Sequence, residues 1–288
     1  MGKFIQYRTN DSLYDGPFGK EHGWPAAGLC DIVITDNGRL IVIDGGQPND
    51  AEDLIKLLEE KAYGKKPIVD LWIITHPHLD HYGALQAICR SEKLASRISV
   101  KKLLWYFPTD FCNKAGDANI LGYGNNDMEE ICRITGAAIY KPSRNDIINI
   151  DDIEIHFLYV PDDCSFINTA SGNANCVSLI FTVKGNSKSV MVTGDAHGRN
   201  MQITVWRYAK KLKCDILQLP HHACCDSYCS EFYYCVDPQI VLEPTSAACF
   251  KAMHTEYFDF EGAKANRDVE EKAEMIYKAF EGTVELEI

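Results

Sequence analysis

The sequence predicts an α/β fold in which two mixed sheets pack together and are flanked by helices, an αββα sandwich. Strand-sized apolar runs occur both early and late in the chain, and helical patterns separate them. The chain has 288 residues without a Gly/Ser linker or a low-complexity tract. A single domain over residues 1–288 is therefore expected.

The first half of the chain begins with a predicted hairpin, because residues 31–43 alternate apolar and polar side chains around Asp36, Asn37 and Gly38. The following elements are a helix from a cap at Asn49 to a stop near Gly64, a buried strand at 68–74, a helix at 84–94 and a strand at 102–107. Residues 108–127 are rich in Gly, Asn and aromatic side chains without a clear period, which predicts a long surface loop. Its aromatic side chains would line a substrate cleft or only anchor the loop.

The second half predicts a strand at 153–160, a hairpin of strands at 177–183 and 189–193, a helix at 200–212, strands at 214–219 and 239–242, an amphipathic helix at 268–280 and a final strand at 283–288. Strands on both sides of these helices support the two-sheet architecture.

The formal net charge of −12 weighs against extended duplex nucleic acid as a partner, because such binding relies on Lys and Arg to neutralise phosphates. A small or short anionic substrate, held by metal ions rather than by lysines, is compatible with this charge. The oligomeric state stays open.

Twelve cysteines would suit a disulfide-rich secreted protein, but residues 1–10 lack the apolar core of a signal peptide. A cytoplasmic protein with reduced thiols is therefore expected. The longest apolar runs are strand-sized, so no membrane association is expected. The cysteines between 214 and 249 form no CxxC pair, which favours small buried thiols over a structural metal site.

The stretch from Thr75 to His81 reads HxHxDH after its threonine and follows the strand at 68–74. In an extended segment His76 and His78 point to the same face, whereas Asp80 and His81 can turn toward a second point. Imidazole and carboxylate groups are the preferred non-thiolate ligands of zinc. Capping and core histidines would explain one such residue, but three histidines and an aspartate at this spacing favour a site for two metal ions.

Three other predicted strands also end in side chains that can bind a metal. Asp44 ends one strand, Asp195 ends another, and the pair His221 and His222 ends a third. A single Asp before a Gly is more often a turn residue. The repetition of this pattern at several strand ends is difficult to explain by packing alone.

With these motifs in place, the chain resembles the metallo-β-lactamase-fold hydrolases, and within them it is similar to the metallo-β-lactamase domain of ComEC-type competence proteins. The matching pieces are DIVIT with IDGG, HPHLDH, the hairpin from NANCVSLI to TGD, and LPHH, which together extend from Asp31 to about His222.

The resemblance implies a ligand set for two divalent metal ions, most simply zinc. His76 and His78 bind one ion; Asp80, His81 and His221 bind the other; Asp195 bridges both; and Asp44 orients the ligands. The superfamily has a further histidine between the HxHxDH motif and the bridging aspartate, and this sequence lacks it. His156 lies in a predicted strand and is interpreted as structural, so the region offers Asn173 and Asn175 near the site instead.

The predicted function is hydrolysis of a phosphodiester by a hydroxide that bridges the two metals and is held through Asp80 and Asp195. His222 would protonate the leaving group, bind the phosphate or only cap its loop. His197 is expected to be exposed at a helix start.

Three alternatives stay open. The same metals could hydrolyse a carbonyl substrate such as a lactone, thioester or β-lactam. A di-iron redox protein or a non-catalytic metal-binding module would use the same scaffold. Redox members typically need an extra carboxylate ligand and a flavin domain, and the chain is too short to append that domain.

Overall fold

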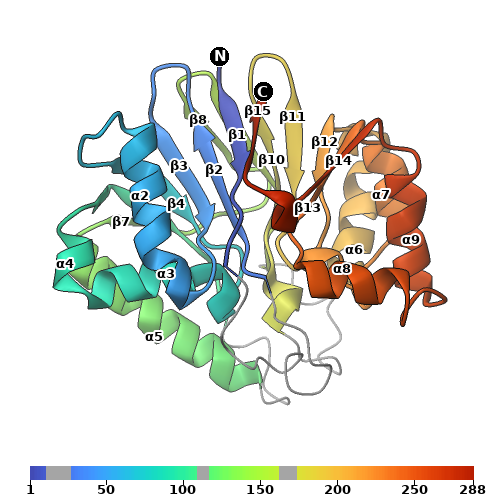
Figure 1. The fold of residues 1–288 in the computed structure, drawn as a ribbon, viewed down its shortest axis with the longest axis horizontal. Coiled ribbons are helices and arrows are strands. Elements are labelled where there is room, and N and C mark those ends of the chain that lie inside the picture. The colour runs from blue at the N-terminus through green and yellow to red at the C-terminus, as the bar shows by residue number, and fades with distance from the viewer. Residues whose placement is uncertain (11–26, 109–116, 162–173) are drawn as a thin grey trace.

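The computed structural model describes residues 1–10, 27–108, 117–161 and 174–288. These residues form two mixed sheets that face each other, with helices on both outer sides (Figure 1). This arrangement confirms the predicted α/β sandwich.

Within the described ranges, the first sheet has eight strands. Their order is β15 (Val284–Glu287), β1 (Lys3–Gln6), β2 (Cys30–Ile34), β3 (Leu40–Asp44), β4 (Ile68–Ile73), β6 (Lys102–Leu104) and β7 (Ala138–Tyr140), and β5 (Ser99–Val100) also pairs with β4. The strands from β15 to β3 are antiparallel, and those from β3 to β7 are parallel.

The second sheet has seven strands in the part of the chain that the structure describes. Their order is β14 (Met275–Lys278), β13 (Ile240–Glu243), β12 (Ile216–Gln218), β11 (Ser189–Val192), β10 (Ile180–Lys184), β9 (Ile153–Tyr159) and β8 (Ile147–Ile150). β8 to β11 are antiparallel, and β11 to β14 are parallel. β15 follows β14 in the chain but pairs with β1 of the first sheet.

Helices cover the outer face of each sheet. The first sheet carries α2 (Ala51–Lys61), α3 (Leu79–Arg90), α4 (Glu92–Ala95) and α5 (Asp117–Thr135), and the second carries α6 (Gly198–Tyr208), α7 (Ser230–Val236), α8 (Ala247–His254) and α9 (Glu261–Glu270) (Figure 1). Short 3-10 helices are η1 (Pro48–Asp50), η5 (Ala174–Val177), η6 (Ala209–Leu212), η7 (His221–Ala223) and η8 (Ala279–Glu281). None of the helices in the described ranges combines the length and the apolar character needed to cross a membrane.

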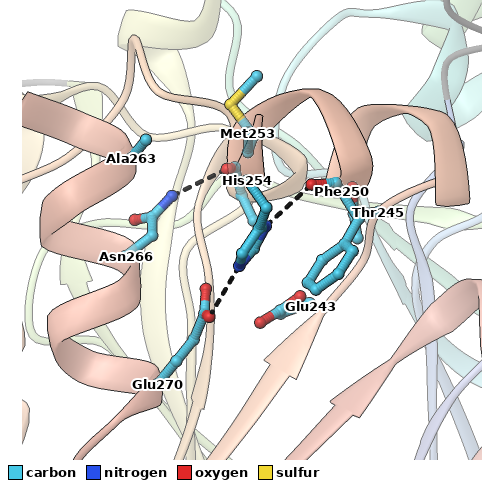
Figure 2. Close-up of a pocket in the computed structure, with 9 residues that line it drawn as sticks. Glu243, Thr245, Phe250, Met253, His254, Ala263, Asn266 and Glu270 are labelled. Carbon is cyan, nitrogen blue, oxygen red and sulfur yellow. Dashed lines mark hydrogen bonds and ion pairs between the residues drawn. The ribbon is translucent and has the colours of Figure 1, made fainter. Parts of the chain in front are cut away.

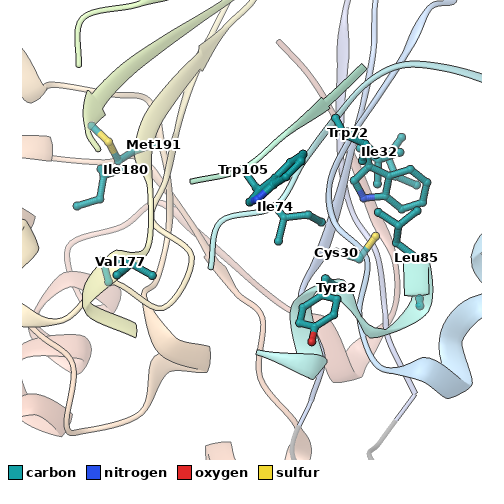
Figure 3. Close-up of a cluster of buried hydrophobic side chains, with 14 of the residues drawn as sticks. Cys30, Ile32, Trp72, Ile74, Tyr82, Leu85, Trp105, Val177, Ile180 and Met191 are labelled. Carbon is teal, nitrogen blue, oxygen red and sulfur yellow. The ribbon is translucent and has the colours of Figure 1, made fainter. Parts of the chain in front are cut away.

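Two large apolar clusters stabilise this arrangement. One lies between the sheets and contains Phe157 and Phe181, whose ring centroids are 5.3 Å apart. The other includes the contact between the first sheet and its helices, where Trp72 of β4 lies beside Ile32 and Leu85 (Figure 3). The indole Nε1 of Trp72 donates a hydrogen bond of 2.6 Å to the carbonyl of Asp44, which ties the ends of β4 and β3 together.

The hairpin at 31–43 forms as predicted, with β2 and β3 paired from Ile34–Leu40 to Cys30–Asp44. Its turn ends at Gly38, which has a φ of +79°, a value that favours glycine. The helix expected at 84–94 begins five residues earlier, at Leu79, so Asp80 and His81 lie in its first turn. The metal motif therefore spans the end of a strand and the start of a helix.

The predicted loop at 108–127 is wrong for its second part, because residues 117–127 belong to α5, and residues 109–116 lie outside the described ranges. Gly and Asn residues hide this helix in the sequence because both have low helix propensity. Gly124 has a packing role there, since a Cβ at this position would lie 2.5 Å from Cβ of Pro77 in the metal motif. α5 therefore packs directly against the motif.

The amphipathic helix predicted at 268–280 is also wrong. α9 ends at Glu270, and residues 275–278 form strand β14, which pairs in parallel with β13. The apolar residues Met275 and Ile276 fit either an amphipathic helix or an edge strand, and here the free edge of β13 decides in favour of the strand.

We expect Phe181→Ala to lower the free energy of unfolding by about 3 to 5 kcal/mol, because it removes a buried ring from the space between the sheets. Tyr234→Ala is the matched control, since that side chain in α7 is 81% exposed, and its effect should stay within about 0.5 kcal/mol. Urea denaturation followed by circular dichroism measures both. Equal effects of the two substitutions would contradict the placement of this core.

Candidate metal centre

The carboxyl ends of several strands meet at one edge of the two sheets. Asp44 ends β3, the HxHxDH motif follows β4, and Asp195 follows β11. His221 and His222 follow β12 in η7, and Pro244 follows β13. The fold thus brings together side chains that are up to about 180 residues apart in the sequence.

The carboxylate of Asp195 lies at the centre of this group and is 1% exposed. Nε2 atoms of four histidines surround it: His81 at 3.2 Å from Oδ1, and His76 at 3.5 Å, His222 at 3.6 Å and His221 at 3.8 Å from Oδ2. A carboxylate in this position can bridge two ions, because each of its oxygen atoms faces imidazole nitrogens.

Two groups of possible ligands share Asp195. One consists of Asp80, His81, Asp195 and His222, and the other of His76, His78 and Asp195. Within each group, the ligand atoms lie within 4.8 Å of one another. Nε2 of His222 is 3.3 Å from Oδ2 of Asp80, which closes the first group.

Three buried atoms at the centre lack a hydrogen-bond partner among the described residues: His81 Nε2, His222 Nε2 and Asp195 Oδ1. Buried polar atoms without a partner cost about 1 to 3 kcal/mol each. These atoms converge on one point, and imidazole nitrogen with carboxylate oxygen is a donor set that suits zinc and iron. The residues present therefore fit a bound metal ion.

Hydrogen bonds at Nδ1 fix the orientation of three of these imidazoles. His81 Nδ1 lies 2.8 Å from Asp44 Oδ2, and His221 Nδ1 lies 2.8 Å from Asp226 Oδ1. His222 Nδ1–H donates to the carbonyl of Pro244 at 2.8 Å. With Nδ1 held in this way, each Nε2 is directed toward Asp195, as is typical of metal-binding histidines.

Asp44 forms hydrogen bonds on both sides of the HxHxDH motif. Its Oδ1 accepts the backbone N–H of Thr75 at 2.8 Å, and its Oδ2 accepts the Thr75 hydroxyl at 2.8 Å. Through these bonds and the contact with His81, Asp44 connects the end of β3 to both sides of the HxHxDH motif.

The backbone is strained where it presents the histidine pair. His221, His222 and Ala223 have consecutive φ values of 48°, 53° and 61°, which cost non-glycine residues on the order of 1 to 3 kcal/mol each. The His221 N–H donates to the carbonyl of Gly194 at 3.1 Å and holds this turn in place. Adjacent residues of an extended strand would point to opposite faces, whereas this turn directs both imidazoles toward Asp195.

In the metal-free protein, the pKa values of the site's imidazoles are shifted in opposite directions. Burial lowers the pKa of His76 and His78. Burial acts in the same direction on His221, but Asp195 and Asp226 outweigh it and raise the pKa of His221 to about 9. Burial alone would raise the pKa of Asp195, yet the surrounding imidazoles, His81 first, hold that pKa well below its usual value.

The structure differs from the expected ligand set at the histidine pair. We expected His221 to join Asp80 and His81, but His222 occupies that position. His221 instead lies in a third group with His197 and Asp226. Nε2 of His222 thus faces the carboxylates of both Asp80 and Asp195.

His197 was expected to be exposed, and the structure contradicts this expectation. Its side chain is half-buried at the N-cap of α6, and its ring centroid is 5.9 Å from that of His221. The tight turn between Asp195 and α6 brings the ring back toward the site. Asp226 was not identified from the sequence, although a carboxylate four residues after a histidine pair was an available signal.

Asn175, expected near the site, contacts one of its histidines. It is buried in η5, and its Nδ2 lies 3.2 Å from Nε2 of His221. Asn173 lies outside the described residues. His156 is in β9, paired with Thr182 of β10 and Ile147 of β8, and belongs to none of the three ligand groups among the described residues.

One curated relative matches a part of this chain. ComE operon protein 3 of Bacillus subtilis (strain 168) is 26% identical over 176 residues, which are 60% of this chain and 20% of that protein. The chain thus spans about a fifth of the length of this relative.

Two solved structures share the fold at low sequence identity. The metallo-beta-lactamase fold protein YhfI from Bacillus subtilis superimposes with a TM-score of 0.57 at 10% identity, over 99% of this chain and 100% of that one. Zn²⁺-bound PqqB from Methylobacterium extorquens gives a TM-score of 0.56 at 10% identity, over 100% of both chains.

The family model of the metallo-beta-lactamase superfamily matches residues 31–228, a range that contains all three ligand groups. The chain therefore belongs to the metallo-beta-lactamase superfamily and has its hydrolase fold, with candidate metal-binding residues at the site.

Proposed function

We propose that the chain is a dinuclear, zinc-dependent phosphodiesterase. The observation that carries this proposal is the position of Asp195, whose carboxylate belongs to two adjacent groups of possible ligands. Two ions about 3.5 to 4 Å apart are typical of enzymes that cleave phosphoesters. The Zn²⁺-bound state of PqqB supports the choice of zinc.

We assign the ligands from the distances. His76, His78 and Asp195 hold the first ion, and Asp80, His81, His222 and Asp195 hold the second. We further assign His221 to the first site, because its Nε2 is 3.8 Å from Oδ2 of Asp195 and, unlike His222, it does not belong to the group around Asp80. In this assignment His221 takes the place of the histidine that the superfamily pattern has and this sequence lacks.

Bound at these residues, the ions would supply a water molecule of lowered pKa and would polarise the phosphoryl oxygens. Asp195 and Asp80 would bind the ions directly, and Asp44 and Asp226 fix the tautomers of His81 and His221. A phosphodiester carries a negative charge, and the protein as a whole has a net charge of −12. Attraction of the substrate must therefore come from the site itself.

We propose small or short phosphodiesters, including single-stranded ends, rather than long duplexes as substrates. The acidic net charge supports this choice, because duplex binding requires many cationic contacts with phosphates. The similarity to ComE operon protein 3 is compatible with it. The described cysteines are all free thiols, which supports a reducing compartment such as the cytoplasm.

Replacing either His76 or Asp80 by Ala should lower the turnover of bis(p-nitrophenyl) phosphate at least about 100-fold. Groups that only orient a metal ligand are worth about 10 to 100-fold, so loss of a ligand should cost more. His156→Gln is the matched control, because His156 lies in β9 outside the three ligand groups, and it should keep wild-type turnover. Persistent turnover in a folded Asp80→Ala variant would refute the assignment.

Metal content separates the roles of the two neighbouring histidines. His222→Ala should reduce the bound zinc from two ions per chain to one, and Asp226→Asn should weaken one zinc about 10 to 100-fold by releasing His221. Asp237→Asn is the control, because this exposed carboxylate forms an ion pair with Lys213 and belongs to none of the three ligand groups among the described residues. Elemental analysis and chelator competition give the two quantities. Two zinc ions at wild-type affinity in His222→Ala would show that His222 is not a ligand.

Zinc binding at pH 7 should release protons. His81 and His221 have raised pKa values, about 9 for His221, so they are protonated in the metal-free protein at pH 7 and must lose a proton before they bind a metal. The apparent zinc affinity should therefore increase between pH 6 and pH 9. Calorimetry in buffers of different ionisation enthalpy counts the released protons, and a count of zero would exclude both histidines as ligands.

A further inference from the structure

A small cavity lies behind the turn that carries His222. Its walls include Ala223 of that turn, Glu243 and Thr245 at the end of β13, Phe250 of α8 and Glu270 of α9 (Figure 2). The space available to the centre of a water-sized body is about 10 Å³. This is roughly what one such occupant requires.

Glu243 contributes a fully buried carboxylate to this cavity. The residue is 0% exposed, and neither of its carboxylate oxygens has a hydrogen-bond partner among the described residues. A buried carboxylate without a donor or a counter-charge is strongly unfavourable. Glu243 therefore needs either a proton shared with Glu270 or a positively charged occupant of the cavity.

The polar groups of the wall offer oxygens rather than donors. The amide of Asn266 donates to the carbonyl of Ala223 at 2.8 Å, and its own carbonyl accepts the Tyr233 hydroxyl at 2.9 Å. The Thr245 hydroxyl donates to the carbonyl of Ser246 at 3.4 Å, which leaves its lone pairs free to accept. An occupant that satisfies Glu243 must therefore carry positive charge or donate hydrogen bonds.

The basic side chains near the cavity form no direct ion pair with Glu243 among the described residues. His254 donates from Nδ1 to the carbonyl of Phe250 at 2.9 Å, and its Nε2 lies 3.4 Å from Oε2 of Glu270, so His254 is directed at Glu270 rather than at Glu243 (Figure 2). Lys278 lies 3.7 Å from Glu281. Lys278 attracts Glu243 electrostatically, but no ion pair joins these two side chains among the described residues.

We propose that this cavity binds one monovalent cation of about the size of water, such as Na⁺ or K⁺, through the oxygens of Glu243, Glu270 and Thr245. Carboxylate and hydroxyl oxygens are ligands that hard cations prefer. The lack of a direct counter-ion for Glu243 among the described side chains and the small volume favour a monovalent ion without its water shell. Burial and Glu270 raise the pKa of Glu243 to about 9, so the ion would compete with a proton for this carboxylate.

The position of the cavity connects it to the metal centre. Glu243 precedes Pro244, whose carbonyl accepts the hydrogen bond from His222, and Ala223 follows His222 in the strained turn. A cation between Glu243 and Glu270 would fix both segments that hold His222. The proposal does not depend on which substrate the metal centre cleaves.

The test compares the melting temperature of the zinc-loaded full chain in NaCl, KCl and tetramethylammonium chloride at equal ionic strength. Tetramethylammonium is too large for the cavity. At a concentration ten times its dissociation constant, Na⁺ or K⁺ should raise the melting temperature by about 3 °C over tetramethylammonium. Glu243→Gln keeps the shape of the side chain and should abolish this difference. Asp237→Asn, at an exposed carboxylate outside the cavity wall, should retain it.

Equal melting temperatures of the wild type in the three salts would overturn the proposal and leave a shared proton as the partner of Glu243. A salt-dependent difference that persists in Glu243→Gln would overturn it as well. A second measurement does not rely on a variant that must fold. Crystals of the wild type grown with Tl⁺ should show an anomalous peak between Glu243 and Glu270, and an absent peak at high Tl⁺ concentration would refute the site.

Discussion

The buried carboxylate of Asp195 is the constraint on which the site depends. At 1% exposure, its negative charge is tolerable only because imidazoles from separate strand ends converge on it. Those imidazoles are in turn fixed by Asp44, Asp226 and the carbonyl of Pro244. In this network, a hydrogen bond or an ion pair with a neighbour holds each charged group in position. Removal of one member leaves its neighbours both misoriented and uncompensated.

Strain in the backbone contributes to this network. Three successive residues, His221 to Ala223, have φ values that non-glycine residues rarely adopt, and Asp44 has a φ of 58°. Such conformations persist only where surrounding contacts over-determine them. At Asp44 these contacts are the hydrogen bonds to Thr75 and His81, and at His221 they include the bond to Gly194. The sheets thus provide the rigidity that keeps a strained ligand turn in place.

The sequence was sufficient to predict the two-sheet fold and most of the side chains around Asp195, because apolar strands that end in His or Asp indicate both. It was not sufficient to choose between His221 and His222, since that choice depends on positive φ values that no residue type there requires. His197 and Asp226 join the site through tertiary turns. Gly124 and its Asn neighbours concealed α5 because that helix depends on packing against Pro77 rather than on propensity.

The last strand pairing in the chain has a consequence for how the molecule unfolds. β15 comes after the strands of the second sheet but hydrogen-bonds to β1 at the edge of the first, from Lys3–Glu287 to Gln6–Val284. Neither sheet can open fully without pulling on this shared segment. Local fluctuations of one layer are thereby transmitted to the other, which favours a single cooperative unfolding unit over two independent foldons.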